Sequence, residues 1–335
     1  MRVVSCSAFG PLELLTVDER PSPPCGPREV RIEVTAAGVN FVDGLIVQGL
    51  YQIKPPVPFT PGNEVAGRIA EVGAEVGADV TGFGIGDRVF ANVGFGGFAS
   101  EVVLDARRVM RTPDALTDGQ AATFTQSYMT AWFALHHRAR AQAGQWLLVL
   151  GAGGGVGLAA VDVGRAMGLQ VIAAASSADK RAVAAAHGAV ATIDTSSEDV
   201  KTRARELLAE LGGEQPADGV DLVYDPVGGA LGEQSLRTLR DDGQFLVIGF
   251  ASGTIPQLPA NHVLLRNRRV TGVDWGGWVA RHQAENAAML AEVVDAIGRG
   301  DLHPVEPVAY PFAEAARALG DQLQRRVTGK TVLVP

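Results

Sequence analysis

Small residues are concentrated in one short stretch, Gly-Ala-Gly-Gly-Gly-Val-Gly at positions 151–157. The apolar run Leu147–Leu150 precedes this stretch, and a helix-like segment follows it. Small side chains let the backbone approach a diphosphate closely, and the free amide groups at a helix N-terminus point toward its negative charge. We therefore predict a strand, a tight turn and a helix start that bind a dinucleotide pyrophosphate, although alanine holds the first glycine position of the fingerprint. The expected contact residues are Ala152, Gly153, Gly154, Gly155, Val156 and Gly157.

The residues after the next expected strand, Val171–Ala175, indicate which dinucleotide binds. In a fold that prefers NAD, an acidic residue at the end of this strand binds the ribose 2′-hydroxyl. Here Ser176 and Ser177 stand at the strand end, and Lys180 and Arg181 follow closely. Hydroxyl groups and cations suit a 2′-phosphate, so we expect NADPH as the cofactor. In the alternative interpretation, Ser177 only caps the next helix and the two cations are solvated.

Cysteine and histidine do not occur at spacings typical of metal sites. The only two cysteines are Cys6 and Cys25, and neither belongs to a Cys-x-x-Cys pair. The six histidines are scattered, and the adjacent His136 and His137 diverge around an expected helix. We therefore expect no metal ligands, and two thiols that stay reduced in the cytosol.

Two kinds of periodicity divide the chain. Up to about residue 115, short alternating strands such as Val30–Val34 are separated by turns rich in proline and glycine, which is typical of a small β-barrel or sandwich. A capping box from Thr117 to Gln120 then opens a helical run that we expect to stop at Gly144. After Gly144, strands and helices alternate, which predicts a parallel sheet with helices on both faces.

The alternating region predicts a ligand site beyond the carboxyl ends of its strands. Gly151, Ser176, Asp225 and Gly249 lie at such ends. The strands are expected at 147–150, 171–175, 191–194, 220–224, 245–248 and 269–274, and the helices at 178–187, 198–211 and 229–239. A helix at 285–297 and a last strand at 330–334 are expected to follow.

The composition is that of a globular protein of about two domains. The 335 residues are 47% hydrophobic and 20% charged, with a formal net charge of −8 and a pI near 5.3. An acidic surface disfavours nucleic acid and anionic membranes as partners. No apolar run has the length of a membrane span, and the N-terminus lacks the features of a secretion signal. We expect a cytoplasmic protein that acts on a small molecule.

Five segments together resemble the zinc-independent quinone oxidoreductases, the zeta-crystallin-like branch of the medium-chain dehydrogenase/reductase superfamily. They are Ala37–Asp43, Gln48–Tyr51, Pro61–Gly67, Gly86–Val89 and Ala152–Gly157. They occur in order and at the family spacing over nearly the whole chain. The resemblance implies an α/β protein in which a GroES-like β-rich catalytic domain, residues 1–120 and 262–335, surrounds a Rossmann NADPH-binding domain with a doubly wound parallel sheet, residues 121–261.

The resemblance also implies how the protein does chemistry. Zinc alcohol dehydrogenases of the superfamily carry a cysteine and a histidine ligand where this chain has Asn40 and Asn63. Amides do not replace thiolate and imidazole as zinc ligands. The implied reaction is hydride transfer from NADPH to a quinone or a conjugated carbonyl, whose own π-system delocalises the incoming charge.

By the same resemblance, Asn40 lies near the nicotinamide and its ribose, and Tyr51 reaches the substrate and assists protonation. In the alternative interpretation, Tyr51 only packs in its proline-rich loop. Gln126 and Thr130 share one helix face, which is expected beside the nicotinamide. The backbone of Gly249, Phe250, Ala251 and Ser252 is expected near the carboxamide. Arg326 is expected near the adenosine phosphate, with the adjacent Arg325 as the alternative.

Two other functions stay open at this point. An enoyl-thioester reductase would need cations for the CoA phosphates, and Arg266, Arg268 and Arg269 are candidates. An NADPH-binding structural or RNA-binding protein, as crystallin relatives suggest, is disfavoured by the acidic charge. Finally, we expect a homodimer whose sheets join edge to edge near residues 269–274.

Overall fold

A computed structural model describes residues 1–76, 82–212 and 217–335 of the chain. The chain forms two compact units, Met1–Thr125 with Pro304–Pro335, and Gln126–His303. Residues 262–303, which the sequence analysis assigned to the first domain, group with the second unit. They do so because this segment adds a strand, β13 (Arg269–Gly272), to the sheet of that unit.

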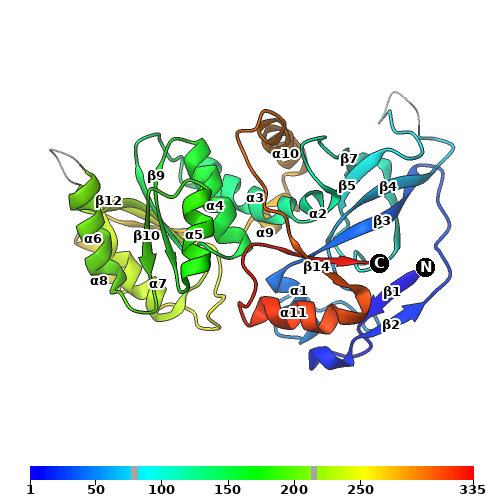
Figure 1. Ribbon diagram of the computed structural model, residues 1–335, viewed down its shortest axis with the longest axis horizontal. Helices are drawn as coiled ribbons and strands as arrows, with labels where there is room; N and C mark the ends of the chain where they lie inside the picture. The colour runs from blue at the N-terminus through cyan, green and yellow to red at the C-terminus, as the bar shows by residue number, and fades with distance from the viewer. Residues whose placement is uncertain (77–81, 213–216) are drawn as a thin grey trace. The chain divides into compact units, whose positions relative to one another are not determined.

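The first unit contains a seven-stranded sheet in the order β14-β15-β3-β4-β5-β7, with β6 paired to β3. Its strands are β3 (Glu29–Val39), β4 (Glu64–Val72), β5 (Arg88–Asn92), β6 (Glu101–Asp105), β7 (Val109–Arg111), β14 (Val308–Pro311) and β15 (Thr331–Val334). A separate antiparallel pair is formed by β1 (Arg2–Ser5) and β2 (Thr16–Glu19). Because β15 pairs with β3, both ends of the chain belong to this unit (Figure 1).

Strand β3 shows how the sheet brings a polar residue into the interior. Its first half alternates, with Val30, Ile32 and Val34 buried and the residues between them more exposed. From Ala36 to Val39 every side chain is buried, because both faces of the strand are covered there. The strand therefore carries the next residue, Asn40, into the core, where helix α1 (Phe41–Val47) begins.

The second unit is a six-stranded sheet in the order β10-β9-β8-β11-β12-β13, and all of its pairs are parallel. Its strands are β8 (Trp146–Leu150), β9 (Gln170–Ala175), β10 (Ala191–Asp194), β11 (Val220–Asp225), β12 (Leu239–Val247) and β13. The connecting helices are α4 (Gly155–Ala166), α5 (Ala178–Ala186), α6 (Val200–Leu211), α7 (Gly229–Ser235) and α8 (Ala260–Leu264), labelled in Figure 1. The parallel sheet confirms the expected α/β class.

The order of the strands puts the reversal of the sheet between β8 and β11. In doubly wound sheets, ligands bind at such a reversal, outside the carboxyl ends of the strands. The turn after β8 begins there, at Gly151. The topology therefore places the glycine-rich turn at the position that suits a nucleotide.

The helices differ from expectation at their ends. The capping box of Thr117 and Gln120 opens only a short helix, α2 (Asp118–Ala121), and α3 (Phe124–Trp132) follows it. The run then passes into a π-helical segment that ends at Arg138 rather than at Gly144. The remaining helices are α9 (Trp275–Val279), α10 (Gln283–Gly298) and α11 (Ala315–Leu323). None of the helices in the described ranges combines the length and the apolar character that a membrane crossing requires.

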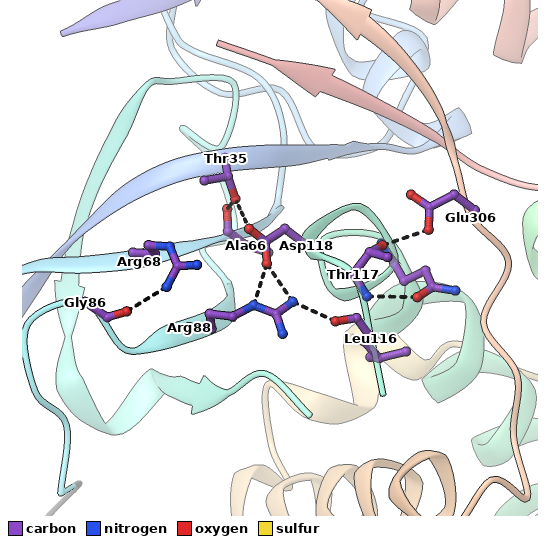
Figure 2. A network of polar contacts seen from close by, with 10 residues as sticks. Thr35, Ala66, Arg68, Gly86, Arg88, Leu116, Thr117, Asp118 and Glu306 are labelled. Atoms are coloured by element: carbon purple, nitrogen blue, oxygen red, sulfur yellow. Dashed lines mark hydrogen bonds and ion pairs between the residues drawn. The ribbon is translucent and has the colours of Figure 1, made fainter. Parts of the chain in front are cut away.

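A network of polar contacts holds α2 in the first unit (Figure 2). Arg88 of β5 makes two hydrogen bonds to Asp118 Oδ1, at 2.9 and 2.7 Å, and Thr35 of β3 donates to Oδ2 at 2.8 Å. On the other side, the Thr117 hydroxyl donates to Glu306 at 2.8 Å. The network thus ties the segment that leaves the first unit to the segment that returns to it.

Candidate functional site

The turn between β8 and α4 is closed by contacts that only glycine allows. Gly151 has φ +59°, in the left-handed region. A Cβ on Gly157 would lie 2.3 Å from the carbonyl oxygen of Gly151, so a side chain there would push the turn open. Ala152 N donates to Ala174 O at 3.1 Å, which ties the turn to β9. The backbone of this turn is therefore compact and fixed.

The start of α4 has the properties of an anion site. Gly154 is the N-cap residue, no side chain caps the helix, and its first turn holds no acidic residue. The amide groups of the first turn have no carbonyl partner within the helix, and they carry the positive end of the helix dipole. The run from Ala152 to Gly157 therefore fits a diphosphate, as the sequence predicts.

The residues expected to bind the 2′-phosphate lie together after β9, and Ser177 and Arg181 make contacts within the fold there. Ser176 and Ser177 are exposed, and Ser177 Oγ accepts the amide of Lys180 at 3.4 Å as the cap of α5. Arg181 forms an ion pair with Asp194 at 3.0 Å and donates to Ala175 O at 3.2 Å. Asp194 therefore offsets part of the charge that the sequence analysis assigned to a phosphate.

The side chain of Lys180 lies against the glycine turn, although the two are far apart in the sequence. A Cβ on Gly153 would meet the stem of Lys180 at 2.5 Å, so the side chain crosses directly over the glycine turn. This contact is made within the second unit. The aliphatic stem of Lys180 thus lies against the turn that the sequence predicts to bind a diphosphate.

The turn after β12 is fixed by its own backbone. The amides of Gly249, Ala251 and Ser252 donate to carbonyl groups of residues 225–227 at 3.2, 3.0 and 2.8 Å. Phe250 O accepts from Gly253 N at 2.8 Å. The backbone that was expected near the nicotinamide carboxamide thus has three of its amide groups bonded within the fold.

Gln126 and Thr130 lie on one face of α3, as predicted. Both are partly exposed, whereas the residues between them, 127–129, are buried. The Thr130 hydroxyl donates to the carbonyl oxygen of Gln126 at 2.7 Å. With its hydrogen used in this way, the Thr130 oxygen can only accept a hydrogen bond from a ligand.

In the first unit, four polar side chains from distant segments meet around Asn40. We call Asn40, Asp43, Glu64 and Lys330 the buried polar centre, because each is at most 6% exposed. Lys330 Nζ donates to Asn40 Oδ1 at 2.6 Å, and Asn40 Nδ2 donates to Glu64 Oε2 at 2.7 Å. The backbone amide of Asn40 donates to Asp43 Oδ2 at 2.8 Å. The same Asn40 Nδ2 donates to Asn63 Oδ1 at 3.1 Å.

Burial perturbs the charges of this centre. It raises the pKa of Asp43 from 3.8 to about 7, an effect that Glu64 adds to and the amide of Asn40 opposes. Burial also lowers the pKa of Lys330, while Glu64 and Asp43 act in the opposite direction. Groups with perturbed pKa values are concentrated at functional sites. The buried polar centre is therefore a candidate site on physical grounds.

Two further predicted residues lie elsewhere in the first unit. Tyr51 is half-buried in the turn after α1 and packs against the core of the unit. Arg326 follows α11, and its guanidinium donates to Asp321 Oδ1 at 3.2 Å. Asp321 thus holds the side chain that was expected to reach the adenosine phosphate.

The sequence analysis assigned no role to Lys330, Glu64 or Asp43. One local signal was available, because Asp43 stands three residues after Asn40, at the spacing of a helix cap. Lys330 gave no such signal, since a lysine before the apolar strand β15 is typical of an exposed strand end. In the described part of the chain, no cluster of three or more His, Cys, Asp and Glu side chains is arranged to hold a metal ion.

Comparison with known proteins agrees with this arrangement. Residues 26–114 match the alcohol dehydrogenase GroES-like domain family, and residues 155–294 match the family described as zinc-binding dehydrogenase. Quinone oxidoreductase-like protein 2 of Rattus norvegicus is 36% identical over 320 residues, which cover 95% of this chain and 88% of that protein. Quinone oxidoreductase of Pseudomonas aeruginosa is 34% identical over 336 residues, 99% of each chain. This chain belongs to the zinc-independent quinone oxidoreductase branch of the medium-chain dehydrogenase/reductase superfamily.

Solved structures extend the family assignment to the whole fold. The quinone oxidoreductase of Thermus thermophilus, described also in complex with NADPH, is 34% identical with a TM-score of 0.84 and full coverage of both chains. CurK enoyl reductase is 26% identical with the same TM-score, over 99% of this chain and 98% of that one. The protein is thus an oxidoreductase with a GroES-like unit and a Rossmann unit. The enoyl reductase neighbour shows that this fold serves more than one kind of acceptor.

Proposed function

We propose that this protein is an NADPH-dependent reductase of quinones or conjugated carbonyl compounds. The observation that carries the proposal is the compact glycine turn, in which Gly157 lies so close to Gly151 that there is no room for a Cβ. The turn leads into α4, whose N-terminus is not capped by a side chain. Such a helix start binds a diphosphate. Support comes from the Thermus thermophilus relative, which was solved with NADPH. In this proposal the second unit binds the cofactor and the first holds the acceptor.

The adenosine end of the cofactor is assigned to Ser176, Ser177, Lys180 and Arg181. Both cations are used in this assignment, and Arg181 shares its charge with Asp194. Exchange of Lys180 and Arg181 for alanine is expected to lower the preference for NADPH over NADH by about tenfold. An unchanged preference in affinity measurements would contradict the assignment.

NADPH supplies a hydride to this reaction, and the chain has to orient the acceptor and stabilise negative charge on its oxygen. We assign these tasks to the first unit, around Asn40 and Tyr51. A metal ion is not expected there, because the Lys330 ammonium group donates to Asn40 Oδ1 and so brings a positive charge into the centre. Thiolate and imidazole groups bind zinc, whereas an amide group is a poor zinc ligand and an ammonium group repels the ion.

The test is a panel of acceptors with the purified protein. Oxidation of NADPH is followed in the presence of quinones, enones and enoyl-CoA thioesters. We expect turnover with quinones or enones at rates well above those with NADH as the donor. Activity with enoyl-CoA alone would favour the second candidate function, and binding of NADPH without turnover of any acceptor would favour a structural role.

An enoyl-thioester reductase is the second candidate, supported by the likeness to CurK enoyl reductase. The cations considered for CoA phosphates are largely occupied, which weighs against it. Arg266 pairs with Asp218 and Asp241 at 3.0 and 3.1 Å, and Arg268 is 9% exposed. The quinone or enone proposal is therefore preferred.

We also propose that the protein forms a homodimer through β13. This strand is at one edge of the parallel sheet, next to β12, and its Val270 is 43% exposed. An edge strand offers unpaired backbone groups to another copy. Sedimentation of the protein as a monomer would overturn this proposal.

A further inference from the structure

A polar cavity of about 510 Å³ lies in the second unit, at the amino ends of its strands. Gln145, just before β8, and Asp221, near the start of β11, line it. The glycine turn begins at the other end of β8, at Gly151. Since an extended chain rises by about 3.3 Å per residue, Gln145 and Gly151 are about 20 Å apart. The cavity is therefore separate from the turn assigned to the diphosphate.

Three neighbouring strands form one wall of this cavity. Gln244 of β12 is in register with Leu222 of β11 and with Arg269 of β13, and all three residues line the cavity. Residues in register carry their side chains on the same face of a sheet. Gln244 is 3% exposed, whereas Arg269 is exposed. The sheet thus sets a buried amide beside an accessible guanidinium group.

An irregularity in β12 brings two more charged residues to the same place. While β11 advances from Val220 to Leu222, its partner β12 advances by five residues. The extra residues include Arg240 and Asp242, which line the cavity, and Asp242 has φ +60°. Bulges of this kind redirect side chains and are frequent beside binding sites. The irregularity therefore shapes the cavity rather than the sheet.

Arginine dominates the charge of the lining. Four arginines contribute to it, Arg138, Arg140, Arg240 and Arg269. Arg240 is paired with Asp221 at 2.6 Å. Arg138 and Arg269 donate to main-chain carbonyl groups, which are neutral, at 3.1 and 3.4 Å. The Arg140 guanidinium group is exposed and has neither a hydrogen bond nor an ion pair with any residue that the structure describes. Three guanidinium charges are therefore available to an anion.

The imidazole of His137, which also lines the cavity, senses this positive charge. It is packed between Phe133 and Trp278, with ring centroids 5.1 Å from each. Burial lowers the pKa of His137, and the charges of its neighbours, Arg138 first among them, lower it further. An anion bound in the cavity acts in the opposite direction. His137 is thus a built-in reporter of the site.

The cavity also offers acceptors, which an anion by itself does not need. Gln244 Nε2 donates to Thr271 Oγ1 at 2.7 Å, but Gln244 Oε1 is buried with no hydrogen-bond partner in the described ranges of the chain. Unsatisfied buried polar atoms are rare in native proteins. Asp242 adds a carboxylate to the lining. Hydroxyl groups on a ligand would supply the hydrogens that these oxygens accept.

We propose that this cavity binds a small sugar phosphate. The three arginines without a carboxylate partner bind the phosphate, because guanidinium groups form paired, charge-assisted hydrogen bonds with phosphate oxygens. Gln244 and Asp242 accept hydrogen bonds from the sugar hydroxyl groups. A volume of about 510 Å³ is larger than a phosphate ion needs and is within the range of sites for small organic ligands. This second site is independent of the acceptor that the enzyme reduces, and it is filled at the same time as the NADPH site.

The test is titration calorimetry on the full chain saturated with NADPH, with ribose 5-phosphate, inorganic phosphate and ribose as probes. We expect one ribose 5-phosphate per chain with a dissociation constant below about 1 mM, and weaker binding of inorganic phosphate and of ribose. The same titration without NADPH is expected to give the same affinity. Displacement of NADPH by ribose 5-phosphate would place the probe in the cofactor site and would overturn the inference, as would an absence of binding.

Two variants locate the probe in the cavity. Arg140→Gln removes an exposed guanidinium group, and we expect the affinity for both phosphates to fall about 10-fold. Gln244→Met removes the buried acceptor, and we expect ribose 5-phosphate to bind about 3-fold more weakly while inorganic phosphate is unaffected. Arg205→Gln on α6 is the matched control, because it removes an exposed arginine outside the cavity, and it is expected to change neither affinity. Equal affinities in all three variants would overturn the assignment.

Proton NMR of His137 gives a measurement that does not depend on heat. Ribose 5-phosphate is expected to raise the pKa of His137 in the wild type, and to do so in Arg140→Gln only at about 10-fold higher concentration. An unchanged pKa in the saturated wild type would contradict binding in this cavity. If the arginines instead contact a second copy of the chain, Arg140→Gln would convert a dimer into a monomer and the wild type would not bind the probe, which would also overturn the inference. Neither result would affect the reductase function, which the acceptor panel tests.

Discussion

The glycine turn and the buried polar centre arrange polar groups in opposite ways. The turn offers the backbone amides at the start of α4, and the close approach of Gly157 to Gly151 leaves no room for a Cβ. The centre uses side chains of Asn40, Glu64 and Lys330, which are far apart in the sequence. The first device is local and the second exists only after the chain has folded.

The two devices are therefore expected to fail differently. A substitution in the turn adds atoms where there is no room, and its main effect is expected to be a decrease in ligand affinity. A substitution in the centre removes a partner from a buried charge, and the free energy of unfolding decreases first. Four changes, taken from the largest expected effect to the smallest, can break or sharpen this contrast.

Lys330→Met tests the charge balance of the centre. Loss of the ammonium group leaves Glu64 buried without its countercharge, and the free energy of unfolding is expected to fall by about 3–5 kcal/mol. Urea titration measures the effect. Adding Glu64→Gln is expected to restore most of the loss, because the neutral pair has no unbalanced charge. A single variant within about 1 kcal/mol of wild type would show that Lys330 and Glu64 are not energetically coupled.

Gly157→Ala tests the turn. The new Cβ would lie 2.3 Å from Gly151 O, and the turn must open to accept it. We expect the NADPH dissociation constant to rise about 100-fold, close to 2.7 kcal/mol. Gly298→Ala in α10 is the matched control, because no atom lies within 4 Å of its Cβ position. Calorimetry that finds equal affinity in both variants would contradict the close-contact argument.

Asp43→Asn tests the titration of the centre near neutral pH. Because the folded pKa of Asp43, about 7, is above its ordinary 3.8, its protonated form stabilises the fold at low pH and this contribution is lost as pH rises through 7. From about pH 5 to pH 8 the loss amounts to about 2–3 kcal/mol. The asparagine variant keeps a neutral side chain, so its stability relative to wild type should rise over this interval.

The control for this titration is Asp199→Asn at the start of α6. The pKa of Asp199 is lowered by its hydrogen bonds to Thr202, so the carboxylate stays ionised over the same interval. Its stability relative to wild type is expected to stay constant from about pH 5 to pH 8. Thermal unfolding at a series of pH values gives both results, and parallel curves for the two variants would refute the raised pKa.

Asp194→Asn gives the smallest effect. The ion pair of Asp194 with Arg181, at 3.0 Å, competes with a phosphate for the guanidinium group. Removing the carboxylate charge is expected to tighten NADPH binding about 3-fold, since exposed ion pairs are worth less than about 1 kcal/mol. NADH affinity should not change. If both affinities rise equally, Arg181 does not distinguish the two cofactors.

Much of the second unit could be predicted from the sequence. The strand, turn and helix around residues 147–160 depend on neighbours in the chain, and the order of strands and helices follows from their alternation. The strand at 191–194 has the predicted limits, whereas β12 begins earlier than expected, at Leu239. The error arose because Arg240, Asp241 and Asp242 are polar, while pairing with β11 and β13 decides where the strand runs.

The side-chain contacts of the predicted cofactor residues could not be predicted from the sequence. Ser176, Ser177, Lys180 and Arg181 are close to one another because they are close in the chain. Two contacts depend on how β9, β10 and α5 pack. They are the ion pair of Asp194 with Arg181 and the contact of the Lys180 stem with Gly153. Pairing of side chains from different elements has no fixed spacing in a sequence.

The sequence by itself determined the nucleotide turn, because backbone conformation and the room for a Cβ are local properties. It also supplied Asn40 and Asn63, at the two positions where the family resemblance implies the zinc ligands of the zinc alcohol dehydrogenases. Only the tertiary structure decided that Lys330 and Glu64 hold Asn40 from both sides. The pairing of β15 with β3 and of β3 with β4 brings these residues together, and the burial of ionised groups gives the contact its strength.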